Sequence, residues 1–210
     1  MNIRVPLSLL FTMLYALSFC QSGKHTTRYM SEAIFADSTS SLMFPVLYNS
    51  ELLSDNKLAT FDEYYANIVF YNFNTDSSKR LFQKDVFIRS FTYYNTYPYP
   101  EKAQRKCDTM TDKWIFYFVK MTDYDKNGRI DGNDPGILYV SDKQGEHLMP
   151  LTKSDENAVS ISIYHKQGFA LVKMQRDFNH DRNFKNNDKD YYYFRLDLNS
   201  LSIGNNIEIN

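Results

Sequence analysis

Short runs of β-branched and aromatic residues, each bounded by turn-forming residues, recur along most of the chain. Such residues pack well on a pleated surface and are enriched in strands. Aromatic residues make up 16% of the 210 residues, which include only seven glycines. The pattern predicts an all-β fold, with only weak helical patterns such as that at 54–65. We expect strands over residues 42–49, 67–73, 86–94, 113–121, 137–141, 159–164, 169–174 and 191–198.

The stretch from Asp123 to Asp134 separates two of these strands and has the spacing of a calcium-binding loop. Oxygen-bearing side chains stand at positions 1, 3, 5, 9 and 12, with Gly128 at position 6. In such a loop alternate residues point at one hard cation, and position 7 contributes its backbone carbonyl. Because the flanks read as strands, we expect a strand–loop–strand site rather than a helix-flanked EF-hand. The expected Ca²⁺ ligands are Asp123, Asp125, Asn127, Arg129, Asp131 and Asp134.

A second loop runs from Asp177 to Asp188 and repeats the first imperfectly. Arg182 stands where the first loop has glycine, and Lys185 replaces the acid at position 9. Position 12 is Asp in both loops, one methylene shorter than the usual bidentate Glu, so we expect affinities of about 10⁻⁴–10⁻³ M. For both loops the alternative is a turn held by its own side-chain hydrogen bonds. The ligands expected in the second loop are Asp177, Asn179, Asp181, Asn183 and Asp188.

The two loops belong to an internal repeat. A Val-Lys-Met triplet precedes each loop, at 119–121 and 172–174, and a tyrosine-containing strand follows each. A degenerate copy, without a metal loop, is expected at 45–48 and 68–71. We predict about three repeated four-stranded antiparallel sheets, the arrangement found in propeller blades. The second sheet would use 86–94, 113–121, 137–141 and 147–151, and the third 159–164, 169–174, 191–196 and 201–203.

Residues 138–152 resemble a blade of the TolB-type β-propeller repeat of bacterial envelope proteins. The resemblance rests on a strand, an Asp142-x-x-Gly145 turn and a short strand ending in Leu151-Thr152. The loops between strands resemble the calcium loops of integrin-type propeller repeats and of EF-hands. Three blades are fewer than the four to eight of a closed ring. Partial blades, pairing of protomers and an open meander or sandwich therefore all remain open.

Residues 1–20 are expected to be a lipoprotein-type signal peptide. Arg4 precedes an apolar run of signal-peptide length, which is too short to span a bilayer. The segment ending in Cys20 resembles a bacterial lipobox, although Phe19 stands where the pattern has a small residue. Lipidation of Cys20 would anchor an exported protein at the bacterial cell envelope, and ordinary cleavage after Ser18 is the alternative. We expect a polar tether at 21–41 and a single β-repeat domain at 42–210.

No catalytic motif stands out, so the sequence favours a binding or structural module over an enzyme. The four histidines have no zinc spacing, and a formal net charge of −1 gives no electrostatic basis for binding nucleic acid. The tyrosines expected to form a contact surface for a protein or glycan, unless they pack along an edge strand, are Tyr93, Tyr94, Tyr97 and Tyr99. The alternatives are an envelope enzyme that uses an unidentified acid pair on glycans, and a subunit that completes its sheet by self-association.

Overall fold

The computed structural model describes residues 28–35, 39–48, 65–92, 113–184 and 188–208. The expectation of an all-β fold is confirmed, since these residues contain thirteen strands and, as their only helix, the short 3₁₀ turn η1 (His165–Gln167). The strands are β1 (Arg28–Met30), β2 (Ile34–Phe35), β3 (Ser41–Tyr48), β4 (Tyr65–Asn72), β5 (Ser77–Arg80), β6 (Phe87–Phe91), β7 (Trp114–Lys120), β8 (Ile137–Asp142), β9 (Met149–Pro150), β10 (Asn157–Tyr164), β11 (Phe169–Gln175), β12 (Tyr191–Asp197) and β13 (Ile203–Ile207).

The first nine strands form one antiparallel sheet. Its main path is β1-β3-β4-β6-β7-β8-β9, while β2 pairs with β3 and β5 pairs with β4. The join between β4 and β6 is a single residue pair, Tyr65 with Ile88. The sheet therefore consists of two sections, β1–β5 and β6–β9, that meet at a narrow junction. The separate first and second sheets expected from the sequence are joined at this point.

The remaining strands form a second, four-stranded antiparallel sheet in the order β10-β11-β12-β13. This is the meander expected for the third repeat. Two glycines at turns between strands are left-handed, Gly145 with φ 72° and Gly168 with φ 69°. Of the segment 54–65 only Tyr65 is described, and it begins β4.

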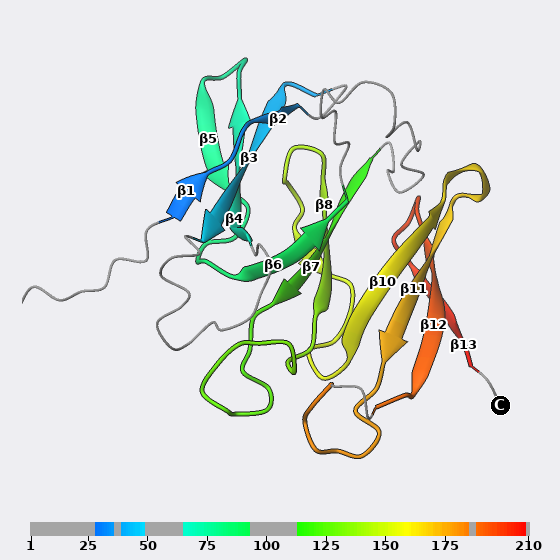
Figure 1. The fold of residues 1–210 in the computed structure, drawn as a ribbon. Helices are drawn as coiled ribbons and strands as arrows, with labels where there is room; N and C mark the ends of the chain where they lie inside the picture. The colour runs from blue at the N-terminus through cyan, green and yellow to red at the C-terminus, as the bar shows by residue number, and fades with distance from the viewer. Residues whose placement is uncertain (1–27, 36–38, 49–64, 93–112, 185–187, 209–210) are drawn as a thin grey trace, which may run out of the picture.

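Strand β7 lies in the middle of the molecule and is covered on both faces (Figure 1). Side chains alternate between the faces of a strand, so a strand with two buried faces is apolar throughout. Phe116 and Phe118 join one hydrophobic cluster with the second sheet, and Ile115, Tyr117 and Val119 join another with the β1–β5 section. The molecule is thus built in three layers, β1–β5, β6–β9 and β10–β13, with the middle section packed between the other two.

Polar contacts also tie the second sheet to the middle section. The Trp114 indole Nε1 donates to the carbonyl of Leu198 at 2.7 Å, and the Arg89 guanidinium donates to the carbonyl of Val159 at 2.8 Å. Because each contact joins residues far apart in the sequence, the second sheet is fixed in position relative to the first.

Part of the segment expected to be a tether is folded. Within 21–41, β1 and β2 both pair with β3, so for these residues the structure corrects the expectation. The segment lacks a sustained apolar alternation because these strands are short and largely exposed. No helix in the described part of the chain is long and apolar enough to cross a membrane.

Candidate metal centres

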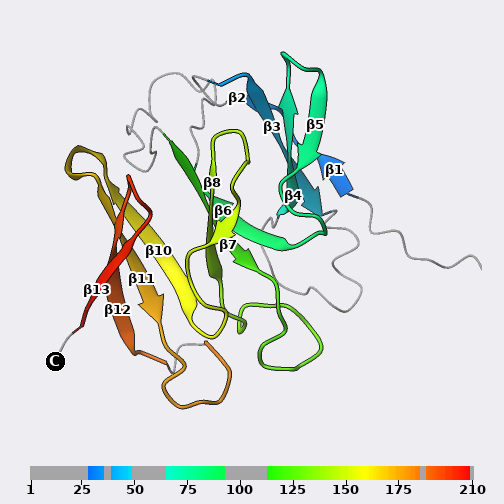
Figure 2. The same ribbon diagram turned by 180° about the vertical axis from the view of Figure 1, so that it is seen from behind.

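The two acidic loops lie side by side at one end of the molecule. The first joins β7 to β8, the second joins β11 to β12, and both project from the same end of their sheets (Figures 1 and 2). They are in direct contact, since the Phe184 N–H donates to the carbonyl of Asn133 at 3.0 Å. The ring centroids of Tyr124 and Phe184 also lie 5.7 Å apart.

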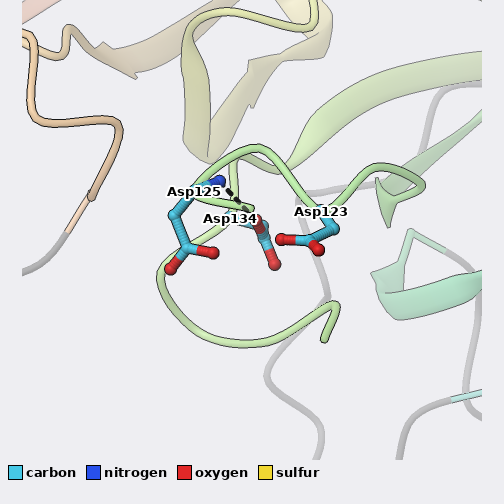
Figure 3. Close-up of side chains that lie close together, drawn as sticks. All are labelled: Asp123, Asp125 and Asp134. Carbon is cyan, nitrogen blue, oxygen red and sulfur yellow. Dashed lines mark hydrogen bonds between the residues drawn. The ribbon is translucent and has the colours of Figure 1, made fainter. Parts of the chain in front are cut away.

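In the first loop the structure brings together Asp123, Asp125 and Asp134. Each offers a carboxylate oxygen, and these oxygens lie within 4.8 Å of one another. The three carboxylates face the space enclosed by the loop, with Asp134 between the other two in the view of Figure 3. Three converging carboxylates are a ligand set suited to a hard cation such as Ca²⁺.

Backbone N–H groups fix the orientation of these carboxylates. Asp123 accepts from the N–H of Asn127 at 3.0 Å and from that of Gly128 at 2.8 Å. Asp134 accepts from the N–H of Tyr124 at 2.7 Å. The loop thus wraps its backbone donors around the carboxylates from outside and leaves their convergent side facing the centre.

Asp134 is fully buried, and burial raises the pKa of its carboxyl above the ordinary value. The backbone donors of Asp131, Tyr124 and Asp125 lower this pKa in part, while the nearby negative charge of Asp125 raises it. A buried carboxylate beside a second carboxylate is costly to keep ionised. A divalent cation among them would remove that cost.

A buried lysine holds the second half of the first loop. The Lys120 ammonium, only 6% exposed, donates to the carbonyls of Asp131 at 2.7 Å, Gly132 at 3.2 Å and Asp134. Burial is the main cause that lowers the pKa of Lys120 to about 8, and the neighbouring Asp134 opposes it. Its contacts are with backbone oxygens, so the lysine shapes the loop through the main chain.

The described part of the second loop shares two left-handed backbone positions with the first loop. Position 4 is left-handed in both, with φ 60° at Lys126 and 59° at His180. Position 6 is also left-handed in both, with φ 85° at Gly128 and 63° at Arg182. A left-handed arginine is unusual, because the Cβ of an L-residue is crowded in this region. The turn is therefore retained in the second copy even without its glycine.

The hydrogen bonds of the two loops also match. Asp177 accepts from the N–H groups of Asp181 at 3.1 Å and Arg182 at 2.9 Å, as Asp123 does at the same positions of the first loop. Position 3 accepts from the N–H of position 5 in both, at 2.9 Å for Asn179 and 3.0 Å for Asp125. The first six positions of the second loop thus repeat the turn of the first loop, in φ signs as well as in hydrogen bonds.

Asp188 provides an independent indication of a missing positive partner. Asp177, Asp181 and Asp188 offer carboxylate oxygens within 4.8 Å of one another. Asp188 is only 2% exposed, and its Oδ2 is buried without a hydrogen-bond partner in the described residues. A buried carboxylate oxygen without a partner loses its hydration uncompensated. The residues present therefore fit a cation at this position.

The other expected ligands lie around these two clusters. Asn127 donates its side-chain N–H to Asp125 at 2.8 Å and to Asp131 at 3.3 Å, which places Asp131 beside the cluster of three carboxylates and not within it. Arg129 and Asn183, at position 7, donate their backbone N–H to the side chain at position 5, at 2.8 and 2.9 Å. Asp131 is thus tied to the cluster through Asn127.

Sequence reasoning missed three residues that support the loops, Lys120, Gln175 and Asn157. Lys120 and Gln175 are the last residues of the strands that enter the two loops, and both are buried. The Gln175 side-chain N–H donates to the carbonyl of Asp188 at 2.7 Å, as Lys120 does to that of Asp134. A long polar side chain at the end of a largely apolar strand was the available signal.

Other expected site residues lie outside the part of the chain that the structure describes. They are the lipidation candidate and the tyrosines of the expected contact surface: Cys20, Tyr93, Tyr94, Tyr97 and Tyr99.

No model of a known protein family and no curated protein matches this chain.

Proposed function

We propose that the protein is a calcium-stabilised β-repeat module that acts at the bacterial cell envelope by binding or by structural support. One Ca²⁺ binds in each acidic loop and fastens the connection between two strands of a sheet. The observation that carries this proposal is the buried Oδ2 of Asp188, which has no hydrogen-bond partner among the described residues and lies inside a cluster of three carboxylates.

Calcium fits both loops better than a transition metal. The side chains in each cluster are carboxylates, and the remaining candidates at the alternating positions are the Asp131 carboxylate, amides and backbone carbonyls, with no His or Cys among them. Oxygen ligands in this number and in a flexible loop suit Ca²⁺, whereas Mg²⁺ requires a more rigid octahedral site. A site outside the cell meets millimolar calcium, so weak affinity is sufficient there.

The export signal and Cys20 support the envelope as the place of action. In this proposal residues 1–20 direct export, and a lipid on Cys20 is the only attachment to the membrane. The three layers further support the interpretation of the sections as propeller-type blades, because successive blades of a propeller pack face to face as these layers do. The partner is then a protein or a glycan of the envelope.

Calcium titration of the purified protein by calorimetry tests the proposal. We expect two ions per chain with dissociation constants in the range of about 10⁻⁴–10⁻³ M. Asp134→Asn and Asp188→Asn should each remove one of the two sites, because each deletes the carboxylate at position 12 of one loop. An equal titration with Mg²⁺ should give weaker binding.

A matched control is Asp190→Asn, which lies just after the second loop and pairs with Arg176 at 3.6 Å. This variant should keep both sites. Absence of any calcium binding by the folded, unmodified protein would refute the proposal.

A further inference from the structure

The two acidic loops are joined by two chains of hydrogen bonds. The first chain begins at the ligands of the first loop. Asn133 donates from its side chain to Asp125 at 3.3 Å and from its backbone N–H to Asp131 at 2.8 Å. Its carbonyl accepts the N–H of Phe184, at position 8 of the second loop.

The second chain runs beneath the loops through two side-chain amides. The N–H of Gly136, just after the first loop, donates to Asn157 at 2.8 Å. Asn157 in turn donates to the Gln175 side-chain oxygen at 2.8 Å, and Gln175 donates to the carbonyl of Asp188 at 2.7 Å. Gln175 is 3% exposed, so its bond to Asp188 is shielded from water. The chain begins two residues after position 12 of the first loop and ends at position 12 of the second.

We propose that the two loops form one paired site, in which calcium bound in either loop raises the affinity of the other. This inference rests on the proposed function, since it requires that both loops bind calcium. Closing one loop around an ion fixes the position of Asn133 and of Gly136, and these contacts hold Phe184 and Asp188 in place. The second ion then meets a loop that is already ordered, so less conformational entropy is lost on binding.

Repulsion between the two ions acts in the opposite direction. Each cation reduces the negative potential that attracts the other, and salt screens this repulsion only in part because Asp134 and Asp188 are buried. The two chains of hydrogen bonds oppose the repulsion, and the bond from Gln175 to Asp188 is itself buried. We therefore expect a net coupling factor of about five to ten at 0.15 M salt, at the lower end of the usual range for coupled sites.

Three calcium titrations at 0.15 M salt measure the coupling. Asp123→Asn/Asp125→Asn removes the first site and leaves the second alone, while Asp177→Asn/Asp181→Asn does the reverse. The binding curve of the unmodified protein should be steeper than the sum of the two single-loop curves and lie at lower calcium. By linkage, each loop should lose affinity by the same factor when the other is disabled.

A fourth variant tests the second chain of hydrogen bonds, which runs through Asn157 and Gln175. Asn157→Ala deletes the amide that joins Gly136 to Gln175 and touches none of the proposed ligands, so both sites should remain while the coupling falls about two- to threefold. Ser160→Ala, at an exposed position of the same strand, should leave the coupling unchanged.

The outcomes separate the two proposals. If the unmodified protein binds no calcium, the proposed function itself fails. If it binds two ions and its curve equals the sum of the single-loop curves, or is shallower than that sum, calcium binding stands and the paired site is wrong.

Discussion

Arg182 and Gly128 occupy the same position in the two loops with the same sign of φ, yet only one of them is a glycine. Glycine adopts this conformation without a steric penalty, whereas other L-residues pay about 1–2 kcal/mol. Nothing lies within 4 Å of a Cβ built on Gly128, so conformation, and not lack of space, is what selects glycine there. The second loop thus carries strain that the first does not.

Replacing Arg182 tests this strain. Arg182→Gly should be more stable than Arg182→Ala by roughly 1 kcal/mol, because both variants remove the charge and only alanine retains a Cβ. Gly128→Ala should lower stability by a similar amount. Urea unfolding of the three variants in excess calcium measures the differences. Equal stability of Arg182→Gly and Arg182→Ala would show that the turn is unstrained.

Gly145 has one structural role that could be predicted from the sequence and one that could not. The Asp142-x-x-Gly145 turn was predictable, and the Gly145 N–H donates to the Asp142 carbonyl at 3.0 Å. A Cβ on this glycine would also come within 2.5 Å of the Phe70 ring. That contact joins two sections of the sheet and has no local signature, because Phe70 is far away in the sequence.

At the scale of elements, β7 decides how the layers stack. Phe116 is completely buried in the cluster that it forms with the second sheet, whereas Tyr193, on the outer face of that sheet, is 39% exposed. Truncation of a buried aromatic side chain removes its packing and leaves a cavity, whereas an exposed side chain has less to lose.

Phe116→Ala should therefore destabilise the protein by about 3–5 kcal/mol, and Tyr193→Thr, which keeps a strand-forming residue, by less than about 1 kcal/mol. Denaturant unfolding followed by the fluorescence of Trp114, which bonds across the two sheets, gives both values. Similar losses for the two variants would contradict the layered core.

Strand positions could be predicted because hydrophobic periodicity is local, but strand pairing could not be predicted in full. The repeated Val-Lys-Met triplets suggested equivalent positions, yet Val119 pairs with Ile137 while Val172 pairs with Phe194, three residues beyond Tyr191. Val119 pairs with the first residue of β8, whereas the residue that pairs with the first residue of β12 is Gln175. The two triplets therefore stand at different positions in their strand pairs. The register is set by the pairing of the two strands and not by the triplet itself.

The metal loops were the most predictable part of the candidate site, because their ligand spacing lies within one short segment. Their mutual contact was not, since it depends on how the second sheet packs against the middle section. The supporting amides Asn157 and Gln175 lie on different strands, and only the register between those strands brings them together.

At the scale of the whole molecule, buried tyrosines predict a loss of stability in alkali. Burial is the main cause that raises the pKa of Tyr48 to about 12, and burial also raises the pKa of Tyr117. Above pH 10 the unfolded chain releases these phenolic protons while the folded chain retains them, so the unfolded state binds fewer protons. Stability must then fall as pH rises from 10 towards 12.

Tyr117→Phe isolates one contribution to this loss. Phenylalanine does not ionise, so the variant should lose less stability than the unmodified protein between pH 9.5 and 12. It should also cost about 1 kcal/mol at neutral pH, because the hydroxyl is bonded to Ser141 at 2.7 Å. Denaturant unfolding across this pH range provides the comparison, and identical slopes would contradict the assignment.

At the scale of the whole molecule, the central claim is that calcium bound in the two loops stabilises the fold by fastening the connection between two strands of each sheet. The most direct test is the melting temperature of the purified protein in EDTA and in 10 mM calcium. Two sites with dissociation constants of about 10⁻⁴–10⁻³ M would add roughly 3–5 kcal/mol of stability. For a chain of this size that corresponds to an increase of about 5–20 °C in the melting temperature. A melting temperature that is the same in EDTA and in calcium would contradict the account.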